Sequence, residues 1–86
     1  MKFCVVCIFD RAANVFGRPA FVASIGLAVR SFQDEVNRSA SDNDVFKHPE
    51  DFDLMDLGYY NDENGYFETH DRALLIGHAS QYKIVK

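Results

Sequence analysis

Two cysteines, Cys4 and Cys7, give the sequence its first candidate for chemistry, a C-x-x-C spacing. In redox proteins this spacing stands at the start of a helix, where the helix dipole lowers a thiol pKa. Here it lies inside an apolar run over residues 3–9 that predicts a buried strand, and alternation sends positions 4 and 7 to opposite faces. A zinc site would need two further ligands, and the three histidines lack metal-finger spacing. We therefore expect two buried, reduced thiols and neither a metal nor a cofactor.

No arrangement of nucleophile and base is recognisable, and the phosphate-loop, dinucleotide-binding and zinc-protease motifs are absent. His48 precedes Pro49, Glu50 and Asp51, so it could titrate near neutral pH or bind a metal with those acids. A loop histidine that helps to close a turn is the commoner case. We expect a protein that is not an enzyme.

The net charge of −4 is distributed unevenly along the chain. Residues 1–43 carry five basic groups against four acids, residues 44–71 carry one against nine, and residues 72–86 carry three basic groups, among them Lys86. Affinity for polyanions comes mainly from Lys and Arg that displace counterions. The middle segment should therefore repel DNA, and its simplest role is that of a solvated acidic face.

Any nucleic-acid contact must then use other parts of the chain. The candidates for phosphate contact are Arg11, Arg18, Arg30 and Arg38, which precede the acidic segment and could share a face. Four aromatic residues, Tyr59, Tyr60, Tyr66 and Phe67, gather further along the chain, and such rings can stack on unpaired bases. Packing across a sheet also explains them and is the favoured interpretation, because the acids Asp62, Glu63 and Glu68 surround the rings.

Hydrophobic periodicity divides the chain into a few elements. Ser24 is a plausible N-cap for an amphipathic helix over residues 24–37, and Gly65 suits the left-handed position of a hairpin loop. The other expected elements are strands at 3–9, 52–60, 67–69 and 73–76, a short extended stretch at 15–16, a helical turn at 45–47 and a terminal turn at 78–82.

This order predicts a single α+β domain over residues 1–86, small and two-layered, with one helix packed on a mostly antiparallel sheet of three to four strands. Residues 52–60 place apolar groups on both faces of their strand, and one helix covers only one face. The uncovered face could bind a ligand or a second copy of the chain, and an 86-residue chain buries a small core. We expect a homodimer. No apolar run approaches the roughly 20 residues needed to cross a membrane, and no signal peptide is recognisable.

Three runs in fixed order give the sequence a specific resemblance: residues 27–37, residues 47–54 and residues 57–65. Together they resemble the small nonstructural protein of gokushoviruses, which are single-stranded-DNA phages of the microvirus family. The motif residues that carry the resemblance are Arg30, Phe32, Asp34, Asn37, His48, Pro49, Asp51, Gly58 and Gly65.

The resemblance implies a nonenzymatic accessory protein of the host cytoplasm. It would bind single-stranded DNA or the replication complex and assist the switch from duplex replication to single-strand synthesis and packaging. Arg11, Arg18, Arg30, Arg38, Tyr59 and Tyr60 are the residues we expect to contact nucleic acid. The alternative is a dimeric adaptor that recruits host replication proteins or phage procapsid proteins through an acidic and apolar sheet face.

Overall fold

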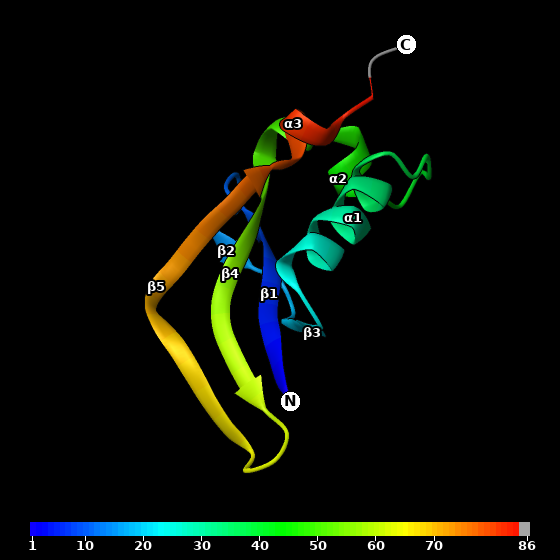
Figure 1. The fold of residues 1–86 in the computed structure, drawn as a ribbon. Helices are drawn as coiled ribbons and strands as arrows, with labels where there is room; N and C mark the ends of the chain where they lie inside the picture. Colours follow the sequence, from blue (N-terminus) through cyan, green and yellow to red (C-terminus); the bar gives the residue numbers. More distant parts are fainter. Residues whose placement is uncertain (85–86) are drawn as a thin grey trace.

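The computed structural model describes residues 1–84 and has one main helix packed against a curled, antiparallel sheet (Figure 1). This confirms the predicted α+β class. The elements in chain order are β1 (Lys2–Asp10), β2 (Val15–Phe16), β3 (Ala20–Val22), α1 (Ile25–Val36), α2 (Asp44–Lys47), the 3-10 turn η1 (Pro49–Asp51), β4 (Phe52–Asn61), β5 (Tyr66–His78) and α3 (Ala79–Tyr82). Within residues 1–84, no helix is long and apolar enough to cross a membrane. The basic residue Lys86 lies outside the described residues.

The sheet is ordered β2-β1-β4-β5, and β3 pairs with the same edge of β1 as β2 does. Every pairing is antiparallel. The central pair, β1 and β4, extends from Lys2 opposite Asn61 to Asp10 opposite Phe52. The apolar run that predicted a strand at residues 3–9 therefore occupies the middle of the sheet.

Helix α1 forms where the periodicity predicts it. The Ser24 hydroxyl accepts a hydrogen bond from the Leu27 amide at 3.3 Å and so caps the first turn. Ala28, Phe32 and Val36 recur every four residues and form the buried stripe. They pack against a core cluster contributed by the sheet and the short helices, namely Val6, Val45, Leu54 and Ala79.

Strand β5 differs from the prediction of two separate segments at 67–69 and 73–76. It is one strand of 13 residues that bends sharply in the middle (Figure 1). Pairing with β4 jumps from Thr69 opposite Gly58 to Leu74 opposite Asp56, so residues 70–73 bulge outward. The polar residues at 70–72 interrupt the strand pattern in the sequence, yet the backbone resumes pairing beyond them.

Pairing registers assign the side chains to two faces of the sheet, since residues directly opposite each other share a face. Cys4 lies opposite Tyr59, and Cys7 opposite Met55, three positions along β1. The two thiols therefore point to opposite faces, and both are buried, as predicted. Burial raises the pKa of the Cys7 thiol, which keeps it protonated at neutral pH.

Candidate nucleic-acid interface

Three aromatic rings cluster on the sheet face opposite α1, at the hairpin end. The Tyr60 ring centroid lies 4.9 Å from that of Phe67 and 5.4 Å from that of Phe21, and the centroids of Phe21 and Phe67 are 6.2 Å apart. The registers explain the cluster, because Tyr60 is opposite Phe67 and Phe21 is opposite Val5. Phe21 and Phe67 are 51% and 57% exposed, so the rings are available to a ligand.

A second aromatic pair lies on the same face at the other end of β1. Phe9 is opposite Phe16 of β2, and their ring centroids are 4.4 Å apart. Phe9 shares its face with Phe3 and Val5, because these positions differ by even numbers along β1. Phe16 is 52% exposed. We call the five residues Phe9, Phe16, Phe21, Tyr60 and Phe67 the aromatic face.

Tyr59 and Tyr60 were both predicted to contact nucleic acid, but the structure separates them onto opposite faces of β4. Tyr59 lies opposite Cys4, on the side that carries α1. The Lys2 ammonium lies 5.8 Å from the Tyr59 ring centroid, and the His70 ring lies edge-on to it at 6.1 Å. His70 Nε2 in turn lies 3.2 Å from a carboxylate oxygen of Asp56. Only Tyr60 belongs to the aromatic face.

The acids around the hairpin have cationic partners. The N-terminal ammonium of Met1 binds Asp62 at 2.8 Å and Glu63 at 3.1 Å, and Lys2 Nζ binds Glu68 at 3.0 Å. The hydrogen bond that the Met1 ammonium donates to Asp62 is the main cause of the raised pKa of this amino group. These exposed pairs stabilise the fold little. They do neutralise part of the negative charge that would repel a phosphate backbone from this end of the sheet.

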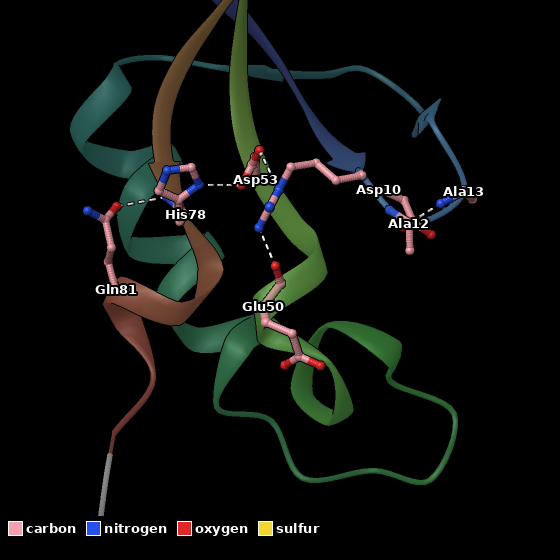
Figure 2. A network of polar contacts seen from close by, with 8 residues as sticks. Asp10, Ala12, Ala13, Glu50, Asp53, His78 and Gln81 are labelled. Atoms are coloured by element: carbon pink, nitrogen blue, oxygen red, sulfur yellow. Dashed lines mark hydrogen bonds and ion pairs between the residues drawn. The ribbon is translucent and has the colours of Figure 1, made fainter.

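Arg11 belongs to a polar cluster built on the buried carboxylate of Asp53 (Figure 2). Arg11 Nε lies 3.1 Å from one oxygen of Asp53, and His78 Nδ1 lies 2.6 Å from the other. Arg11 also donates to the backbone carbonyl of Glu50. Gln81 of α3 accepts from the His78 amide at 2.8 Å and fixes the end of β5. Arg11 and His78 thus satisfy the buried charge of Asp53. Together with Glu50 and Gln81, these contacts join the end of β1 to η1, β4, β5 and α3.

This cluster lies at one end of the aromatic face, because Asp53 is opposite both Phe9 and His78 in the sheet. The side chains of Arg11 and His78 remain 44% and 40% exposed. Asp53 therefore fixes the orientation of two side chains that stay partly exposed. Asp53 was not predicted as a site residue. A charged residue within an apolar strand could have indicated it.

Arg18 occupies the connection between β2 and β3, with Phe16 two positions before it and Phe21 three positions after it. It is exposed, and within residues 1–84 it takes part in no ion pair. Its position in the chain places a cation between the two groups of aromatic rings.

Arg30 and Arg38 belong to the opposite layer, so the expectation that four arginines share a face is wrong. Arg30 is an exposed residue of α1, which packs on the other side of the sheet. Arg38 follows the helix and binds Glu35 through two bonds of 2.7 and 3.1 Å. The hydrogen bond from Arg38 lowers the pKa of Glu35. Position before the acidic segment could not separate the two layers, because Arg18 lies in a connection between two strands and Arg30 lies on the helix that packs over the sheet.

Several motif residues serve the fold. Phe32 is in the core, and the Asn37 amide donates to the carbonyls of Gln33 and Tyr82, both at 2.9 Å. Asn43, which was not predicted, is buried and bridges the carbonyls of Glu35 and Arg38. Asp34 is exposed on α1, and nothing in its surroundings assigns it a role.

The turn residues of the motif lie apart from the aromatic face. Pro49 begins η1, whose carbonyl at Asp51 accepts from the Arg11 amide at 2.8 Å. The ligand atoms of His48, Glu50 and Asp51 lie within 4.8 Å of one another, on a largely exposed turn. Gly58 and Gly65 have φ values of 137° and 74°, which favour glycine.

The comparisons with known proteins agree with the resemblance that the motif residues indicate. Residues 3–82 match the family described as Phage ORF5 protein. The chain is also 34% identical over 70 residues to Protein ORF5 of Chlamydia phage 1, an alignment that covers 79% of this chain and 73% of that protein. Chlamydia phage 1 is a gokushovirus. No solved structure matches the chain. The chain therefore belongs to the Phage ORF5 protein family, a family of bacteriophage proteins.

Proposed function

We propose that this protein binds single-stranded DNA on the aromatic face of its sheet. The observation that carries the proposal is the cluster of Phe21, Tyr60 and Phe67 on the face that α1 leaves uncovered, in which Phe21 and Phe67 are exposed and Tyr60 is half-buried. Every unpaired base offers a π-face, so rings presented in this way bind single strands with little sequence preference. Ring–ring packing alone leaves half of the Phe21 and Phe67 surface in water, which favours a ligand over a purely structural role.

The geometry favours single strands over duplex DNA. In a duplex the bases stack on one another and show only their edges in the grooves, which a helix or a narrow ribbon usually enters. Here the rings come from five strands, β1 to β5, and α1 packs on the other side of the sheet. Binding should be modest and dependent on salt, because Arg11 and Arg18 are the arginines near the face. With two phosphates neutralised, the slope of log affinity against log salt is about −1.4, at roughly 0.7 per contact.

The role that we propose is that of a nonenzymatic accessory protein. Bound to newly made single strands in the host cytoplasm, it would assist the change from duplex replication to single-strand synthesis and packaging. What supports this is the membership of a bacteriophage family together with an aromatic surface suited to unpaired bases. Phage replication or procapsid proteins are the further partners that such a role would bring into contact with it.

Fluorescence anisotropy with a labelled 20-nucleotide oligothymidylate tests the proposal. Phe67→Ala should weaken binding about 5- to 150-fold, the range for loss of one base–aromatic stack. Tyr66→Ala is the matched control, because Tyr66 is the adjacent, 71% exposed ring and lies opposite Asn61 on the other face. It should change the affinity by less than twofold.

Two outcomes would contradict the proposal. One is equal weakening by both substitutions, and the other is no binding by the parent protein at low salt. If the parent does not bind and has a dimeric mass, the aromatic face serves the contact between copies, and the protein-adaptor alternative replaces this proposal.

A further inference from the structure

The aromatic face has two groups of rings, and base stacking at the hairpin end uses only one of them. Phe9 and Phe16 lie at one end of β1, whereas Phe21, Tyr60 and Phe67 lie toward the other. Phe9 is six positions along β1 from Phe3, which is opposite Tyr60. At roughly 3.3 Å per residue, Phe9 lies about 20 Å along β1 from the position of Tyr60 and about 13 Å from that of Phe21, which is opposite Val5.

We propose that Phe9 and Phe16 form a second base-stacking subsite, so that one DNA strand lies along β1 and contacts both groups of rings at once. This inference rests on the proposed binding of single-stranded DNA. A strand rises about 3.4 Å per nucleotide when its bases are stacked, so a span of about 20 Å corresponds to roughly six stacked nucleotides, and to fewer when the bases are splayed.

The charges near the second subsite support a nucleic-acid strand as its occupant. Arg11 follows β1 directly, and its guanidinium is held by Asp53, the residue opposite Phe9. Arg18 lies in the connection between Phe16 and Phe21. A strand that contacts both groups of rings therefore passes a cation between them and reaches another at the Phe9 end. Arginine suits such contacts because its planar group pairs with phosphate and also stacks on bases.

The length of the oligonucleotide distinguishes one subsite from two. A dithymidylate is too short to join Phe9 and Phe21, about 13 Å apart along β1, so it reaches one group of rings, whereas a dodecathymidylate reaches both. Phe16→Ala should therefore weaken binding of the dodecamer about 5- to 150-fold. It should change dithymidylate binding by no more than about twofold, since the hairpin-end rings remain. Val15→Ala is the matched control, because Val15 is the neighbouring residue of β2, is 57% exposed and points to the other face.

Phe16 also packs on Phe9, so a second variant separates binding from folding. Phe16→Leu keeps an apolar contact but removes the ring, and it should weaken dodecamer binding while the melting temperature stays near that of the parent. The second subsite is refuted if both variants bind the dodecamer as the parent does while Phe67→Ala binds it more weakly. If the parent binds neither oligonucleotide, the proposed function itself fails, and the two failures are thus distinguishable.

Discussion

Among single residues, Asp53 is the buried charge that two side chains from other parts of the chain contact. Its side chain is 7% exposed, and a buried carboxylate is costly unless partners satisfy it. Arg11 and His78 supply those partners from elements that are distant in the sequence. The cluster therefore joins the end of β1 to the end of β5 and orients Arg11 beside the aromatic face.

Replacing Asp53 by Asn should lower the free energy of unfolding by about 1–3 kcal/mol, because Arg11 and His78 lose a charged acceptor and are themselves partly exposed. Urea denaturation measures the change. Asp62→Asn is the control: this carboxylate is exposed and pairs with the N-terminus, so its removal should cost less than about 1 kcal/mol. Equal losses in the two variants would show that burial of Asp53 does not matter.

The buried thiols give a second prediction at this scale. Because burial raises the pKa of Cys7, the neutral thiol predominates in the folded protein, and a thiol-specific reagent should react with it slowly until urea unfolds the chain. Replacing Cys4 and Cys7 by Ala or Val should lower the free energy of unfolding by about 1–3 kcal/mol without abolishing DNA binding. Rapid modification of the native protein would contradict the assignment.

At the scale of elements, the bent strand β5 depends on one close approach to β4. Gly58 has a φ of 137°, and a Cβ there would lie 2.1 Å from the Glu68 carbonyl oxygen. Gly58→Ala should therefore lower the free energy of unfolding by about 2–4 kcal/mol. Gly65→Ala is the matched control, because Gly65 also has a positive φ, 74°, but nothing lies within 4 Å of its added Cβ. It should cost about 1 kcal/mol, and thermal unfolding compares the two variants.

Helix α1 and the hairpin were predictable from the sequence because their signals are local. Ser24 begins a helix whose apolar residues keep one period, and Gly65 closes a short loop between two strands. The continuity of β5 was not predictable, since the polar residues at 70–72 resemble a loop and only pairing with β4 makes them part of a strand. The separation of the arginines into two layers was not predictable either. Arg18 and Arg30 both precede the acidic segment in the sequence, and only the packing of α1 on one side of the sheet separates them.

At the scale of the whole molecule, the sheet has one covered face and one exposed face. The exposed face presents Phe16, Phe21 and Phe67, each more than half exposed, and Leu75 of β5 adds to the same side because it is opposite Met55. A small chain buries little core, and a second copy that covers these rings would remove apolar surface from water. We predict a homodimer at tens of micromolar, measured by light scattering after size exclusion. Because DNA and a second copy would use the same rings, saturating dodecathymidylate should shift the mass toward the monomer, whereas a monomeric parent would remove the dimer.

We place single-stranded DNA on the aromatic face and not on the layer that contains α1. The most direct test is a titration of the nitrogen-15-labelled protein with dodecathymidylate, followed by amide chemical shifts in two-dimensional NMR spectra. We expect the amide chemical shifts of Phe9, Phe16, Arg18, Phe21, Tyr60 and Phe67 to change, and those of α1 around Arg30 to stay the same. Shifts that cluster on α1 near Arg30, or spectra that do not change at low salt, would contradict this placement.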